Sequence, residues 1–282
     1  MNGNRATTLR RGIQLLEHLS SVTDTEGVAA AELARSLGIE RSVVHRTLQV
    51  LHELELVEKD PLTLNFRPGW RMFTLAAGVA SQRLMALAPA FLERLSGSSG
   101  EAAYLSVRDR DRVRTILSTP SSSVVQAVNR TGETSPLTCT SAGRAFLIDY
   151  DKAALERLLG PGPYESPTPA SARNLDELVS RLEAARQSGV VVADEEFEIG
   201  LIGLAAPVRD FRRGVAAAVN ISGPAYRMRP RLDELVVLLR QESAWLSAQL
   251  GFVVSSQTSE DGPPKRQTGD EAGRRSGQAA RS

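Results

Sequence analysis

The chain is poor in the residues that build metal and catalytic centres. Its 282 residues include one cysteine, Cys139, and three histidines, His18, His45 and His52, which all lie in the first 52 positions. A single cysteine excludes an intramolecular disulfide and a multi-cysteine zinc site, as is typical of a reducing compartment. The histidine-free remainder cannot build a Ser-His pair, a Cys-His pair or a histidine metal site by itself. No cofactor or metal ion is therefore expected.

Long apolar runs and a strong charge of either sign are also missing. The start, MNGNRATTLRRG, has no signal-peptide core, and no later run approaches the roughly 18 apolar residues of a membrane-spanning helix. We therefore expect a cytoplasmic protein with no membrane partner. The net charge of +1 excludes a polycation that coats nucleic acid, so any binding to DNA must come from a local patch. No P-loop occurs, and no GxGxxG follows a strand pattern.

Residues 29–54 predict two helices joined by a tight turn at Gly38. From residue 30 on, the sequence of this stretch is AAELARSLGIERSVVHRTLQVLHEL. Gly38 suits the left-handed conformation that ends the first of them. In the second helix Val44, Leu48 and Leu51 recur at i, i+4 and i+7, so they form one stripe that can pack on a small core. A helical hairpin of this kind occurs in many folds and has no function by itself.

The opposite face of that second helix is polar. It presents Ser42, Arg46, Gln49 and Glu53. Ser, Arg and Gln at this spacing can contact phosphates and base edges in a major groove. This face predicts a DNA-recognition helix, and the alternative is a solvated surface without a partner.

The surrounding elements have the order of a winged helix-turn-helix. A preceding helix over residues 7–20 is expected to begin at a Thr7 or Thr8 N-cap. Its inward residues should be Leu9, Ile13, Leu16 and Leu19, and those of the next helix Ala30, Leu33, Ala34 and Leu37. Residues 56–58 and 62–66 predict two short strands around Asp60-Pro61. Residues 1–66 carry seven basic and nine acidic side chains, so affinity for DNA must rest on Arg35, Arg41 and Arg46, which cluster near the turn.

Residues 70–97 are apolar at helical spacing and predict a long helix that Pro89 kinks or restarts. Its apolar stripe suits packing against a second subunit, although packing on its own chain is as good an explanation for the second half. Beyond it the pattern predicts an α+β domain with an antiparallel sheet. The expected strands are residues 102–107, 113–118, 124–129, 190–194, 201–208 and 215–222. The expected helices are residues 141–150, 152–159, 175–187 and 231–250.

This pattern divides the chain into four parts. Residues 1–68 should form the winged helix-turn-helix, residues 69–98 the long helix, and residues 99–252 the α+β domain. Residues 253–282 are rich in Gly, Ser, Pro, Gln and mixed charge, and we expect a disordered tail there.

Four sequence blocks resemble the IclR family of transcriptional regulators over roughly residues 6–251. They are RGIQLLEHL at 11–19, LARSLGIERSVVHRTLQVLHELELVE at 33–58, GETSPLTCTSAGRAFL at 132–147, and ADEEFEIGLIGLAAPVRD with AAAVNISGP at 193–210 and 216–224. The resemblance implies a dimer or dimer of dimers on operator DNA, and a GAF-like C-terminal domain that binds a small molecule. It also implies that the long helix is a linker used in dimerisation and that the α+β domain binds an effector. The recognition helix keeps Ser42, Val44, His45 and Arg46 of the usual motif. It has Val43 where Thr is common, and Arg144 stands where Lys is common.

Matching the blocks residue by residue assigns two sets of contacts. The DNA-binding set is Arg35, Arg41, Ser42, Val43, His45, Arg46 and Gln49. The effector-binding set is Ala127, Ser135, Ser141, Ala142, Asp194, Gly203, Asn220 and Ser222. We hypothesise that the effector is a small organic acid whose carboxylate is hydrogen-bonded at Ser141 and Ala142, where a helix begins. Ser141 could instead be only the N-cap of that helix, and Asp194 part of a solvated turn.

Two other functions remain open at this point. The C-terminal domain could serve only for oligomerisation of a DNA-binding regulator. A hydrolase that uses only carboxylates around residues 194–196 is also conceivable, although we expect no enzyme. Cys139 is most simply a packed small residue, and a redox-sensing role is the alternative.

Overall fold

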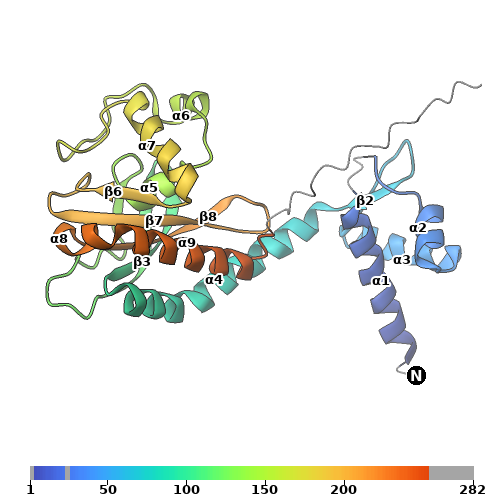
Figure 1. The fold of residues 1–282 in the computed structure, drawn as a ribbon. Helices are drawn as coiled ribbons and strands as arrows, with labels where there is room; N and C mark the ends of the chain where they lie inside the picture. Colours follow the sequence, from blue (N-terminus) through green and yellow to red (C-terminus); the bar gives the residue numbers. More distant parts are fainter. Residues whose placement is uncertain (1–2, 23–25, 254–282) are drawn as a thin grey trace, which may run out of the picture.

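A small helical domain and a larger α+β domain lie at opposite ends of one long helix (Figure 1). The structure is a computed structural model, and it describes residues 3–22 and 26–253, with the side chains of residues 3–6 left out. The predicted tail from residue 253 on therefore falls, except for its first residue, outside the described residues.

The amino-terminal domain consists of three helices and a two-stranded wing. Its elements are α1 (Gly3–Ser21), α2 (Ala30–Leu37), α3 (Arg41–Glu53), β1 (Val57–Lys59) and β2 (Phe66–Pro68). The predicted stripe of α3 is confirmed, because Val44, Leu48 and Leu51 are buried. Gly38 has φ 62° and ends α2, as expected. An isolated bridge between Val28 and Phe66 joins the wing to the segment before α2.

Helix α1 differs from the prediction in two details. Helix α1 begins before Thr7 and Thr8, so neither residue is its N-cap. Leu15 and Leu19 are buried in the core and Leu16 packs against it, whereas Leu9 and Ile13 are 70% and 48% exposed. The core is small, and a helix longer than that core leaves its first turns in solvent.

The second strand of the wing begins four residues later than expected. The carboxylate of Asp60 accepts hydrogen bonds from the backbone N–H groups of Leu62 and Thr63, both at 2.9 Å. These bonds fold residues 60–65 into a turn. Leu62 and Leu64 are consequently exposed, and Phe66 is the residue of the predicted strand that enters the core.

Helix α4 (Trp70–Ser99) runs without interruption through Pro89, so the helix does not restart there. By length and mean hydropathy it is apolar enough to cross a membrane, contrary to the expectation that no segment would be. This criterion is weak evidence, because a core helix of a soluble domain also meets it. The second half of α4 is such a core helix, with Leu84, Phe91, Leu92 and Leu95 buried on the sheet of the larger domain.

The larger domain is built on a six-stranded antiparallel sheet with the order β5-β4-β3-β8-β7-β6. Its strands are β3 (Ala102–Asp109), β4 (Arg112–Thr119), β5 (Thr134–Pro136), β6 (Val191–Asp194), β7 (Leu201–Arg209) and β8 (Val215–Pro224). Its helices are α5 (Ser141–Ala145), α6 (Lys152–Leu159), α7 (Leu175–Ser188), α8 (Ala225–Met228), the 3-10 turn η1 (Arg229–Arg231) and α9 (Leu232–Gln249). The predicted α+β architecture is confirmed.

Each face of this sheet has its own hydrophobic core. Helices α4 and α9 cover one face, and α5, α6 and α7 cover the other (Figure 1). Side chains alternate along β3 and β8, so Leu105 and Val219 enter the first core while Ala218 enters the second. The sheet therefore separates the linker helix from the face that carries α5.

Residues 124–129 do not form the predicted strand. They belong to an irregular loop, residues 120–133, in which Val124 is 99% exposed. Side chains from other elements hold its backbone. Arg227 donates to Val125 O at 3.1 Å, and the Tyr104 hydroxyl donates to Val128 O at 2.9 Å. The third expected strand of the domain is instead β5, and the expected helix 141–150 is shortened to α5.

Candidate functional site

The polar face of α3 is presented to solvent at one end of the molecule (Figure 1). Of the predicted DNA contacts, Arg35, Arg41, Ser42, His45, Arg46 and Gln49 are exposed, and Val43 is half-buried. The Ser42 hydroxyl donates to the Glu40 carboxylate at 2.6 Å. A contact from Ser42 to a phosphate must therefore compete with this hydrogen bond.

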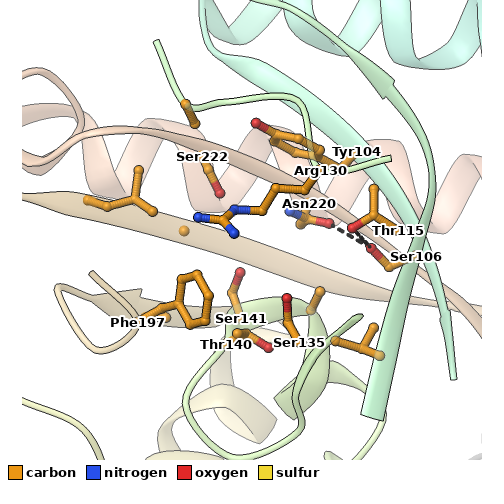
Figure 2. A pocket seen from close by; sticks show the side chains of 16 residues that line it. Tyr104, Ser106, Thr115, Arg130, Ser135, Thr140, Ser141, Phe197, Asn220 and Ser222 are labelled. Atoms are coloured by element: carbon orange, nitrogen blue, oxygen red, sulfur yellow. Dashed lines mark hydrogen bonds between the residues drawn. The ribbon is translucent and has the colours of Figure 1, made fainter. Parts of the chain in front are cut away.

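A polar cavity lies on the sheet face opposite α4. Seven of the eight predicted effector contacts line it, namely Ala127, Ser135, Ser141, Ala142, Gly203, Asn220 and Ser222. The cavity volume is about 70 Å³. Tyr104, Ser106, Thr115, Thr140, Phe197 and Arg130 complete most of its polar and aromatic lining (Figure 2).

The floor of the cavity is formed by alternate residues of three neighbouring strands, β3, β8 and β7. Tyr104 of β3 lies opposite Asn220 of β8, and Ser222 of β8 lies opposite Gly203 of β7. The Ser106 hydroxyl donates to the Asn220 amide oxygen at 3.4 Å. Burial raises the pKa of the Tyr104 phenol to about 12, so this side chain stays a neutral hydrogen-bonding group. The floor thus offers several hydroxyls and one amide to a ligand.

Gly203 allows α5 to approach the sheet. A Cβ atom at residue 203 would lie 2.8 Å from Ser141 Oγ and 3.2 Å from Ser222 Oγ, both of which are closer than normal contacts. The missing side chain therefore leaves room for the two hydroxyls to face each other across the cavity.

The start of α5 forms the opposite wall, and it differs from the expectation in one respect. The N-cap is Thr140, whose Oγ1 accepts a hydrogen bond from Gly143 N at 3.0 Å, and not Ser141. Because α5 has only five residues, its dipole is small. The attraction of this wall for an anion therefore cannot rest on the helix end alone.

Asp194 lies outside the cavity, unlike the other residues of its predicted set. It accepts hydrogen bonds from the Arg229 guanidinium, one of them at 2.7 Å, and Arg229 also pairs with Glu195. Successive residues of a strand point to opposite faces, so its neighbour Ala193 lines the cavity instead. Asp194 is the last residue of β6 and is held in an ion pair, so it is neither a contact of this cavity nor part of a solvated turn.

Arg130 lines the cavity but is not in the effector-binding set predicted from the sequence. Among the described residues that line the cavity it is the only charged one. Its guanidinium points into the middle of the cavity (Figure 2) and lies 4.9 Å from the centre of the Phe197 ring. The available signal was a basic residue two positions before the GETSP block. Because a strand was predicted at 124–129, the loop that carries Arg130 beside the cavity was not expected.

A buried ion pair supports the wall that carries Phe197. Arg144 of α5 donates to the Glu196 carboxylate at 2.7 Å and to Val192 O at 2.7 Å, and Arg181 of α7 also binds Glu196. Burial lowers the pKa of Arg144 and the Glu196 charge opposes that shift. This pair ties loop 195–200 to α5.

Neither the cavity nor the rest of the described chain offers an evident metal centre. No group of three His, Cys, Asp or Glu side chains that could hold a metal ion occurs within residues 3–22 and 26–253. Burial raises the pKa of the Cys139 thiol to about 12, so the reactive thiolate is scarce near neutral pH. The cavity is suited to binding a small polar molecule through hydrogen bonds and one guanidinium.

A winged helix-turn-helix joined by a long helix to a domain with a polar cavity is the arrangement of a DNA-binding regulator. Two family models match the chain. The IclR helix-turn-helix domain matches residues 8–61, and the bacterial transcriptional regulator IclR C-terminal domain matches residues 76–248. The chain belongs to the IclR family and is a DNA-binding transcriptional regulator.

Individual relatives agree with this assignment. The transcriptional repressor AllR of Salmonella paratyphi A is 28% identical over 249 residues, which cover 88% of this chain and 91% of AllR. The structure of an IclR regulator from Alicyclobacillus acidocaldarius matches 87% of this chain and 99% of its own, with 26% identity and a TM-score of 0.56. An IclR homologue from Microbacterium hydrocarbonoxydans, solved in complex with 4-hydroxybenzoate, matches 86% and 99% with 22% identity and a TM-score of 0.54.

Proposed function

We propose that this regulator binds a small organic acid in the cavity of its C-terminal domain and that the bound acid alters its affinity for operator DNA. The observation that carries the proposal is the cavity itself. It combines Asn220, Ser222 and Ser141, which can hydrogen-bond a ligand, with the cation of Arg130. A pocket with a few convergent polar groups is the usual form of a small-molecule site. The complex of a structural neighbour with 4-hydroxybenzoate gives a precedent for an acid in this fold.

We propose a homodimer or a dimer of dimers, working on double-stranded operator DNA in the cytoplasm. The first half of α4 supports this assembly, because Trp70, Phe73, Leu75 and Val79 are exposed on it. Two copies of α3 would then contact half-sites about 34 Å apart, or a multiple of that distance. Sedimentation of a Leu75→Glu, Val79→Glu double variant as a monomer would support the assignment, and an unchanged mass would contradict it.

A thermal-shift screen against small carboxylic acids tests the effector role. An acid that stabilises the wild-type chain should lose most of this effect with Gly203→Ala, because the new methyl group displaces the hydroxyls of Ser141 and Ser222. Gly214→Ala is a matched control, since no atom lies within 4 Å of a Cβ at residue 214. Equal stabilisation of wild type and Gly203→Ala by the acid would exclude this cavity.

The same screen separates the alternatives. A domain used only for oligomerisation would bind none of the acids, and a carboxylate-only hydrolase would consume a stabilising ligand. A domain used only for oligomerisation needs no such cavity, and no Asp or Glu is found among the described residues that line it. Gel shifts with DNA from upstream of the gene, with and without a stabilising acid, would then connect binding to regulation.

A further inference from the structure

Arg130 joins two separate loops over the cavity. It belongs to loop 120–133, and its Nη2 atom lies 3.4 Å from the Glu198 carboxylate of loop 195–200. Its guanidinium also stacks on Phe197 of that second loop, 4.9 Å from the ring centre. The side chain is 30% exposed, so it is neither free in solvent nor fixed in a core. Arg130 therefore connects the two segments that flank the cavity (Figure 2).

The carboxylates that hold Arg130 in place are exchangeable partners. Glu198 is 61% exposed, and Glu133, whose Oε2 atom lies 3.2 Å from Arg130 Nη1, is 55% exposed. Both distances exceed those of a strong guanidinium–carboxylate pair, and exposed ion pairs contribute little to stability. A carboxylate inside the cavity would meet the same guanidinium with less competition from water.

Other contacts fix the backbone of loop 120–133 on both sides of Arg130. The Tyr104 hydroxyl donates to Val128 O, and Gly132 N donates to Thr115 O at 2.8 Å. The Ser121 hydroxyl donates to Gly100 O at 2.6 Å, and Arg227, which is paired with the buried Glu101, donates to Val125 O. Loop 195–200 is likewise anchored at Glu196 by Arg144. Because the backbone of both loops is held, the part of this contact that can exchange partners is the Arg130 side chain.

We infer that Arg130 recognises the carboxylate of the effector, and that it does so by releasing Glu198, so that ligand binding and the ion pair between Arg130 and Glu198 are mutually exclusive. This inference rests on the proposed effector role and adds the recognising residue, the competing carboxylate and the ligand class. With a cavity of about 70 Å³, roughly five water-sized groups fit. The matching ligand is a monocarboxylate of about two to four carbon atoms with a polar or small apolar end facing Asn220 and Ser222.

The test uses the full chain with acetate, propionate, lactate and butyrate, each beside its neutral amide. Affinity is obtained from the concentration dependence of the thermal shift. Arg130→Met, of similar length but uncharged, should weaken acid binding about 10- to 100-fold and leave amide binding unchanged. Arg130→Lys should recover part of the loss. Glu198→Gln and Glu133→Gln should each strengthen acid binding by about 2- to 5-fold, because each removes a competing carboxylate.

Hydrogen–deuterium exchange without ligand gives an independent readout of the contact. Arg130→Met and Glu198→Gln should both accelerate exchange in loop 195–200. Glu133→Gln is the matched control, because Glu133 pairs with Arg130 from the same loop and should leave that exchange unchanged.

The outcomes separate this inference from the effector role on which it rests. Acid binding by Arg130→Met with wild-type affinity would overturn the role of Arg130 and leave the cavity as an effector site. Unchanged exchange in Glu198→Gln would overturn the connection between the loops. Failure of the wild-type chain to bind any acid of this panel would overturn the two- to four-carbon ligand class inferred here, whereas failure of every acid in the broader thermal-shift screen would overturn the effector role itself.

Discussion

Arg144 and Glu196 form an ion pair inside the effector domain, with Nη2 and Oε1 2.7 Å apart and side chains that are only 1% and 8% exposed. The Nε atom of Arg144 is buried without a hydrogen-bond partner among the described residues. A buried cation of this kind depends on its counter-ion, because removal of one partner leaves an uncompensated charge in a medium of low dielectric constant.

Glu196→Gln should therefore lower the free energy of unfolding by about 3 to 5 kcal/mol. Urea unfolding followed by the fluorescence of Trp245, which lies on α9 of the same domain, measures the loss. Glu198→Gln is the control two residues away, where an exposed pair predicts a change of about 1 kcal/mol or less. Similar urea midpoints for Glu196→Gln and Glu198→Gln would mean that the pair of Arg144 and Glu196 does not stabilise the domain.

Arg46→Ala should reduce specific DNA binding by about 1 to 3 kcal/mol if Arg46 makes a bidentate contact to a base. We expect this loss because the guanidinium of Arg46 is exposed on α3. Gel shifts with specific and with unrelated DNA measure the two affinities. Arg240→Ala removes an exposed arginine from α9 and should leave both affinities unchanged. An equal loss on both DNAs would instead assign Arg46 to a phosphate.

Leu51→Ala should destabilise the amino-terminal domain by about 2 to 5 kcal/mol, because the buried side chain packs between α3 and its neighbours. Val50→Ala truncates the adjacent residue, which is 53% exposed, and should have a much smaller effect. Thermal unfolding of the two variants compares them directly. A greater loss from Val50→Ala would reverse the assigned orientation of α3.

The buried thiol predicts a dependence of stability on pH. The pKa of Cys139 is about 12 in the folded protein, against an ordinary value of 9.0. Above about pH 9 the unfolded chain loses this proton while the folded chain retains it, so stability should fall as the pH rises from 9 towards 12. Cys139→Ala should flatten the decline between about pH 9 and 10, before tyrosines contribute. A slope that is unchanged in this variant would show that the thiol does not cause it.

Local sequence signals were sufficient to predict a helix where capping residues mark its two ends. Helices α6 and α7 begin at the capping residues Asp151 and Asn174, whose side chains bond the first turn, and α7 ends at Gly189 with φ 77°. Their predicted ranges are accordingly correct to within one residue. The expected strand at 215–222 likewise agrees with β8 to within two residues.

Distant contacts explain what the sequence did not predict. Arg227 and Tyr104 hold residues 124–129 as a loop, although three valines there favour a strand. Which apolar residues of α1 are buried depends on how far the small core of the amino-terminal domain extends along the helix, and the sequence of α1 alone does not show this. Arg144 was a charge-conserving replacement in the sequence, and its importance is visible only once Glu196 lies beside it.

The two-sided sheet makes the path from effector to linker very short. Asn220 faces the cavity, while its neighbours Val219 and Ile221 belong to the core that contains Phe91 and Leu95 of α4. A displacement of Asn220 by a bound acid would reach the support of the linker helix through a single peptide unit. A signal between the two ends of the molecule would thus begin by crossing the thickness of one strand, and α4 itself spans the remaining distance.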